Sequence, residues 1–132
     1  MSQENVEVVR AVVDALNRQD FDEAFEHLAP DFVYDHTRAI GLDGGFYDRE
    51  QARRLAEELM LDLWESIHWG VSEFIASGDL VVTPLENELV GRDGIAVRAR
   101  VTWLWSLRDR KIERLCLYQD KREALEAAGL RE

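Results

Sequence analysis

The chain has 132 residues, of which 46% are hydrophobic and 33% are charged, a composition typical of one globular domain over residues 1–132. Its formal net charge of −11 argues against binding to nucleic acid or to anionic membrane surfaces, because both require basic side chains. No apolar run is long enough to cross a bilayer and the N-terminus lacks a signal-peptide pattern, so we expect a cytoplasmic protein without membrane contact.

Three helices are predicted in the first half of the chain. Apolar residues recur at helical spacing over 4–17 and over 20–28, and Pro30 ends the second pattern. A third and longer helix is predicted over 49–64, where Asp48 opens a capping box. We expect this helix to pack on a sheet through one apolar face, formed by Ala52, Leu55, Ala56, Leu59 and Leu63.

Strands dominate the second half of the chain. They follow a first short strand at 32–35 and a loop at 36–47, whose glycines lack the spacing of a phosphate-binding motif. β-Branched and aromatic residues mark the later strands, which are followed by a short helix at 121–128. This order is typical of an α+β fold, and predicts a curved mixed or antiparallel sheet wrapped around the long helix, with a conical pocket between them.

The stretch 95–120 is expected to form the hairpin at the centre of this sheet, with its two strands joined at 108–110. Apolar residues occupy both faces of its first strand around Trp103, as in a strand that is covered on both sides. The preceding strand, 80–90, contains Pro84, so we expect a bulge or bend there.

Two registers are possible between these neighbouring strands. In the first, Asn87 lies opposite Arg98, and the polar face that also carries Arg100 and Thr102 offers hydrogen-bond donors to a carbonyl, enolate or carboxylate. A slip of one residue instead brings two glutamates opposite the arginines, which then form only ion pairs within the sheet.

Three segments carry a resemblance to a known family: ALNRQDFDEAFEHLAPDFVYD (15–35), FYDREQARR (46–54) and WSLRDRKIERLCLYQDKREALEAAG (105–129). They resemble the nuclear-transport-factor-2-like superfamily, and most of all its SnoaL-like branch of polyketide cyclase and ketosteroid isomerase relatives. The similarity covers essentially the whole chain and implies the fold described above. That branch includes isomerases, cyclases, dehydratases and epoxide hydrolases, so the activity must be argued from the site.

The resemblance also implies positions for catalytic groups. The ketosteroid isomerases use an aspartate base at the end of the first strand, where this chain has Asp35. Their oxyanion hole consists of a tyrosine and a protonated aspartate. Here Val12 and Thr102 occupy those two positions, which leaves Thr102 as one weak donor. Limonene epoxide hydrolases use an aspartate, an arginine and a second aspartate, and this chain has Asn87, Leu85 and Leu117 at those positions. Epoxide hydrolysis of that type is therefore not expected.

Asp35 has two possible environments. At the mouth of an apolar pocket its pKa would be raised and it could act as a general base, whereas hydrogen bonds from loop amides would keep its pKa low. Strand alternation points His36 to the opposite face, so no direct dyad with Asp35 is expected. The histidines lack metal-ligand spacing and Cys116 lies in a strand as a packed thiol, so we expect neither a metal nor a cofactor.

Further apolar residues are expected in the pocket, namely Trp64, Leu104, Leu115 and Leu117. Trp103 and Trp105 have the opposite phase from Thr102, which places them on the back of the sheet, where relatives of this superfamily form dimers. Exposed tryptophans would need covering, so a homodimer is expected.

Together these features predict a SnoaL-like protein whose pocket holds a small hydrophobic carbonyl compound. Asp35 would move a proton next to the carbonyl, and Thr102, with Asn87 or Arg100, would stabilise the oxyanion. Two alternatives stay open: a pocket that binds without turnover, and a structural dimer whose cavity is filled by leucines. The volume of the cavity distinguishes the last of these from the other two.

Overall fold

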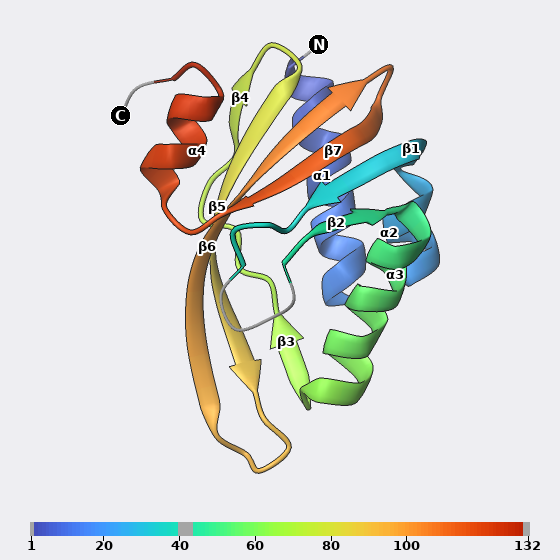
Figure 1. The fold of residues 1–132 in the computed structure, drawn as a ribbon, viewed down its shortest axis with the longest axis vertical. Coiled ribbons are helices and arrows are strands. Elements are labelled where there is room, and N and C mark those ends of the chain that lie inside the picture. The colour runs from blue at the N-terminus through green and yellow to red at the C-terminus, as the bar shows by residue number, and fades with distance from the viewer. Residues whose placement is uncertain (1, 40–43, 131–132) are drawn as a thin grey trace.

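The computed structural model describes residues 2–39 and 44–130, which form an α+β fold around a curved sheet (Figure 1). In chain order the elements are α1 (Ser2–Asn17), α2 (Phe21–Glu26), β1 (Leu28–Asp35), β2 (Phe46–Asp48), α3 (Arg49–Glu57), η1 (Glu58–Leu63), β3 (Ser66–His68), β4 (Ile75–Ser77), β5 (Leu80–Val90), β6 (Ala96–Arg108), β7 (Lys111–Tyr118) and α4 (Lys121–Ala127). None of the described helices is long and apolar enough to cross a membrane.

The strands form one sheet in the order β2-β1-β7-β6-β5-β3, and β4 pairs with β5. β1 and β7 are parallel while the other neighbours are antiparallel, so the predicted α+β class with a curved mixed sheet is confirmed. β6 and β7 form the central hairpin, as predicted. Asp109 and Arg110 connect them with φ values of 52° and 64°, the two positive values of a type I′ turn.

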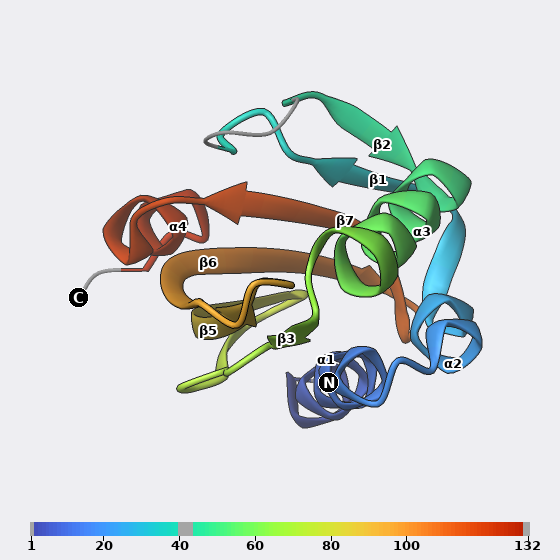
Figure 2. The same ribbon diagram turned by 90° about the horizontal axis from the view of Figure 1, so that it is seen from below.

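The helices cover both faces of the sheet, and Figure 2 shows α1 and α3 inside its curve and α4 on the outer side. The main core fills the concave side, between the sheet and the first three helices. On the outer side Leu104, Cys116 and Tyr118 pack against Ala124 and Leu125 of α4. β6 is therefore covered on both faces along the part that carries Leu104.

The structure differs from the predicted elements in three places. α2 ends at Glu26 because Leu28 already pairs with Ile112, so β1 is longer than predicted. β2 was predicted as loop, and it pairs with the end of β1; residues 40–43 of that loop lie outside the described residues. The predicted helix over 49–64 has its capping box but becomes a π-helix from Glu58 onward.

Candidate functional site

A cavity of about 630 Å³ lies on the concave side of the sheet. This volume is within the range of roughly 300–1,000 Å³ that small-molecule sites occupy, so the leucines do not fill the cavity. All four tryptophans of the chain line it. Trp64 directly follows η1, Trp69 directly follows β3, and Trp103 and Trp105 belong to β6. Among the described lining residues, Arg100 alone carries a permanent charge. The space therefore suits an uncharged, largely apolar molecule.

Three of the four indole rings are held in place by hydrogen bonds. The Trp69 Nε1 donates to Met60 Sδ at 3.4 Å, and the Trp105 Nε1 donates to Thr83 Oγ1 at 2.9 Å. The Trp103 Nε1 donates to the hydroxyl of Tyr34 at 3.2 Å. Fixed rings make a preformed cavity, which binds a ligand with less loss of side-chain freedom than a mobile one.

The orientation of β6 is opposite to the prediction. Trp103 and Trp105 face the cavity and are 4% and 1% exposed, whereas Thr102 and Leu104 lie on the outer face and do not line it. The expected roles of Thr102 as an oxyanion donor and of Leu104 as a pocket residue therefore do not fit the geometry. The homodimer was inferred from tryptophans on the back of the sheet, and its only remaining support is the family resemblance.

Asp35 also lies on the outer face, and it does not line the cavity. Its Oδ1 accepts hydrogen bonds from the Thr37 hydroxyl at 2.6 Å and from the Thr37 backbone N–H at 3.1 Å. Its Oδ2 accepts from Arg114 at 3.2 Å and from Arg38 at 3.5 Å. Burial alone would raise the pKa of this carboxyl, but the bonds from Thr37 and the two guanidinium groups together hold the pKa below its ordinary value.

This environment is the second of the two anticipated for Asp35, a carboxylate bonded to its own loop. The prediction that Asp35 is a base facing an apolar cavity is therefore wrong in its geometry. Cys116 belongs to the same outer cluster: it is buried and accepts a hydrogen bond from Arg114 Nε at 3.3 Å.

The side chains on either side of Asp35, Tyr34 and His36, enter the cavity instead. Their rings lie 4.9 Å apart, and Tyr47 of β2 packs edge-on against His36 at 5.7 Å. The His36 backbone is fixed as well, since its N–H donates to the Gly45 carbonyl at 2.8 Å. These are the cavity groups best suited to proton chemistry.

The hydroxyl of Tyr34 stays protonated at neutral pH. Burial raises the pKa of Tyr34 well above its ordinary value of 10.0, although the hydrogen bond from Trp103 opposes the shift. Because the hydroxyl oxygen already accepts from Trp103, its own proton is available for an acceptor on a ligand.

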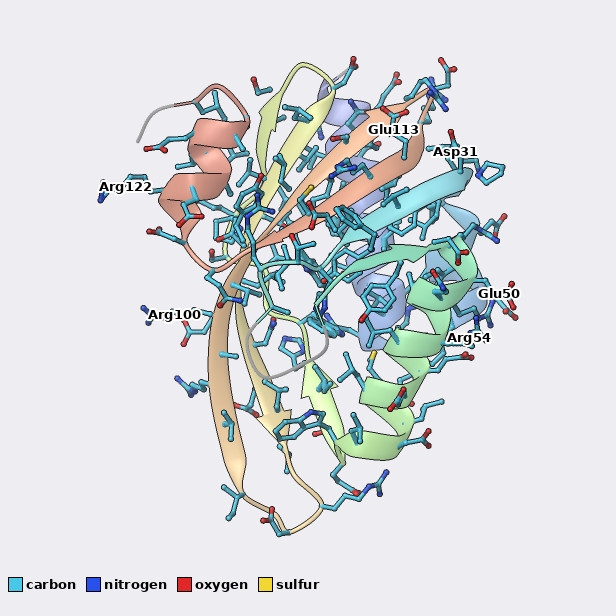
Figure 3. The ribbon with its side chains drawn as sticks, in the orientation of Figure 1. Asp31, Glu50, Arg54, Arg100, Glu113 and Arg122 are labelled. Atoms are coloured by element: carbon cyan, nitrogen blue, oxygen red, sulfur yellow. The ribbon has the colours of Figure 1, made fainter. Side chains whose placement is uncertain are left out.

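The register between β5 and β6 is the slipped one. Glu86 pairs with Arg100 and Glu88 with Arg98, while Asn87 lies opposite Ala99. Arg98 and Arg100 reach Glu86 at 3.6 and 3.8 Å as exposed ion pairs. Figure 3 shows Arg100 pointing away from the sheet on the side opposite α3, and its side chain is largely exposed although the residue is among those that line the cavity.

The remaining predicted pocket residues are placed as expected, since Trp64, Leu115, Leu117 and Asn87 line the cavity. The apolar face predicted for the long helix also lines it. No group of three or more His, Cys, Asp or Glu side chains within residues 2–39 and 44–130 is arranged to hold a metal ion.

Sequence reasoning missed Tyr34 as a site residue and discounted His36. The signal was present in FVYDHT, where alternation puts Tyr34 and His36 on one face and Asp35 on the other.

Comparisons with known proteins agree with this architecture. The model of the SnoaL-like domain family matches residues 9–115, and no curated protein sequence matches the chain. TerC, crystallised with polyporic acid, superposes with a TM-score of 0.78 at 21% identity, covering 96% of this chain and 98% of TerC. Bal32a from a soil-derived mobile gene cassette gives a TM-score of 0.79 at 16% identity, covering 89% of each chain.

An LEH-like epoxide hydrolase of Mycobacterium tuberculosis is a third similar structure. It superposes with a TM-score of 0.73 at 20% identity, covering 96% of this chain and 92% of the hydrolase. At such identities the likeness of these three structures establishes the fold and leaves the chemistry to the side chains.

Proposed function

Because the chain belongs to the SnoaL-like domain family, we propose that it binds a small, uncharged, hydrophobic molecule in its cavity. The observation that carries this proposal is the preformed cavity of about 630 Å³ lined by all four tryptophans. The similar protein TerC was crystallised with polyporic acid, which supports a small-molecule ligand for this fold. The acidic net charge of −11 gives no support to a nucleic-acid or anionic membrane partner.

The chemistry that best fits the cavity is proton transfer next to a carbonyl. His36 acts as the base that removes a proton from the carbon beside the carbonyl, and Tyr34 donates a hydrogen bond to the oxygen as it becomes an enolate. Return of the proton to a different carbon completes an isomerisation. Attack of the enolate carbon on a second carbonyl of the same molecule would instead close a ring, with the proton passing to the new alkoxide.

4-Acetylbiphenyl, a rigid aromatic ketone, is a suitable probe of ligand binding and of proton removal next to the carbonyl. Its binding should quench the tryptophan fluorescence, and turnover should exchange its methyl protons for deuterium in D₂O, followed by NMR. His36→Gln should slow this exchange by about 10²–10⁴-fold, the range of a general base. Tyr34→Phe should slow it by about 10²–10³-fold, as when one oxyanion donor is removed.

The matched control is His68→Gln, which replaces an exposed histidine outside the cavity and should leave exchange unchanged. Exchange that survives His36→Gln at the wild-type rate would overturn the catalytic role of that residue.

A second candidate function is binding without turnover. The observation in its favour is that none of the described lining residues is a carboxylate, while Asp35 is engaged on the outer face. Binding of 4-acetylbiphenyl with no enzyme-dependent exchange would establish this second function. Absence of binding would overturn both.

A further inference from the structure

Asn87 is a polar side chain built into an apolar part of the cavity. It is 4% exposed and lies on the concave face of β5, opposite Ala99, which also lines the cavity. Its Oδ1 accepts a hydrogen bond from the backbone N–H of Gly70 at 3.3 Å. This bond fixes which end of the amide is oxygen, and so leaves Nδ2 as the free end of the amide.

The backbone around Asn87 is arranged to make this contact possible. A Cβ on Gly70 would lie 2.4 Å from the carbonyl oxygen of Glu86, so the close approach of the two chains requires glycine. The Glu86 N–H in turn donates to the Gly70 carbonyl at 2.7 Å. Within residues 2–39 and 44–130, no protein acceptor is bonded to the Asn87 Nδ2.

Building on the proposed function, we propose that Asn87 is a second recognition group, whose Nδ2 donates a hydrogen bond to an acceptor at the far end of the ligand. The structure thereby specifies the ligand class: an elongated, rigid, uncharged molecule with a hydrogen-bond acceptor at each end. A buried amide donor left unbonded in an apolar cavity is costly, so a ligand that satisfies it gains affinity over one that does not.

The spacing of the two polar regions sets the length of this ligand. Trp103, which bonds the Tyr34 hydroxyl, pairs with Thr83 across β5 and β6, and Asn87 lies four residues further along β5. At about 3.4 Å per residue, the two regions are separated by roughly 14 Å along the strand. Between these two levels the strands carry Val101 of β6, which lines the cavity, and its partner Leu85 of β5, and neither has a polar side chain.

Two matched ligands test this assignment. 4-Acetylbiphenyl has one ketone, and 4,4′-diacetylbiphenyl carries a ketone at each end of the same rod. Calorimetry on the wild-type protein should show the diketone binding about five- to tenfold more tightly, the gain of one hydrogen bond. In Asn87→Leu, which has no amide donor, the preference should fall to about twofold, the statistical advantage of a ligand with two equivalent ends.

Asn87→Leu also removes the hydrogen bond to Gly70, and Asn17→Leu is the control for such a loss. Asn17 also ties the loop after β3 to the rest of the protein, since it accepts from the Trp69 N–H at 2.7 Å and donates to the Trp69 carbonyl at 3.0 Å, but it does not line the cavity. Its variant should keep the wild-type preference for the diketone.

The outcomes separate this inference from the proposed function. If wild-type protein binds both ketones equally, or if Asn87→Leu retains the preference, the role of Asn87 is overturned while the proposed function stands. If neither ketone binds, the proposed function fails and the inference fails with it. A shift of the Asn87 side-chain amide signal in ¹⁵N NMR, seen with the diketone and not with the monoketone, supports the inference without any variant at Asn87.

Discussion

Replacing Asp35 by asparagine separates a structural role from a catalytic one. The side chain is 9% exposed and accepts bonds from the Thr37 hydroxyl, the Thr37 N–H, Arg114 and Arg38. Asparagine has nearly the same shape and can still accept from Thr37 through its Oδ1. It loses the negative charge, which leaves both guanidinium groups without their buried partner.

The magnitude follows from these contacts. The two arginine side chains are 42% and 45% exposed, so solvent screens the ion pairs and each contributes at most about 1 kcal/mol. Weakening the charge-assisted bond from Thr37 adds on the order of 1 kcal/mol. We therefore expect Asp35→Asn to lower the free energy of unfolding by about 2 kcal/mol at pH 7. The control Asp31→Asn removes an exposed carboxylate of the same strand and should cost less than about 0.5 kcal/mol.

The contribution of Asp35 to the free energy of unfolding should decrease at low pH. The pKa of Asp35 is lower in the folded protein than its ordinary value of 3.8, so its stabilisation is complete above about pH 4. The stabilisation is lost as the pH falls through the lower folded pKa, and wild type and Asp35→Asn should then converge. Urea unfolding across pH 2–7 measures this, and NMR titration of the carboxyl gives the pKa itself.

Two results would refute this account of Asp35. The first is a pKa above 3.8 in the folded protein, which would indicate an apolar environment. The second is loss of deuterium exchange of 4-acetylbiphenyl in Asp35→Asn while stability is unchanged, which would make Asp35 the base after all.

Three further predictions concern the backbone and the contact between the β5–β6 hairpin and η1. Gly70→Ala should lower the free energy of unfolding by about 2–3 kcal/mol, because its Cβ would lie 2.4 Å from the Glu86 carbonyl oxygen; an unchanged urea midpoint would contradict this. Arg110→Gly should raise the free energy of unfolding by about 1 kcal/mol, because Arg110 has a φ of 64°; a lower midpoint is the opposing result. Arg92→Ala should speed dissociation of 4-acetylbiphenyl in stopped-flow fluorescence. Arg92 lies in the β5–β6 hairpin, and its Nε donates a hydrogen bond to the carbonyl of Asp62, near the end of η1, at 2.9 Å. An equal dissociation rate in the variant would show that this contact does not control ligand release.

The sequence predicted the elements well and their orientation poorly. Helix periodicity, the capping box at Asp48 and the central hairpin are all local or period-based signals, and the structure contains each of them. Alternation also correctly separated His36 from Asp35 and the tryptophans from Thr102. It cannot say which face of a strand meets the cavity, and on β6 both faces are apolar because α4 covers Leu104. The face was therefore assigned from the isomerase alignment, and that assignment was wrong.

A longer stretch of β6 contains the information that was needed. Residues 97, 99, 101, 103 and 105 are all apolar, whereas Arg98 and Arg100 occupy the alternate face at the same end of the strand. Only the first face is apolar along the whole strand, so it is the one that can line a cavity, and the arginines belong in solvent. The same reasoning favours the slipped register, in which the arginines meet Glu86 and Glu88 on the outer face.

The orientation of β1 is fixed by contacts on both of its faces. Inside, the Trp103 indole bonds Tyr34, and outside, Arg114 bonds Asp35. A shift of one residue would break both contacts and would bring a carboxylate into an apolar space, where loss of hydration opposes its charge. A carboxylate base at this strand end thus requires a different pattern of partners from the one that this chain has. Among the described lining residues, the groups left for chemistry are therefore one imidazole, neutral donors and the Arg100 guanidinium. This lining is the basis on which we propose an uncharged ligand.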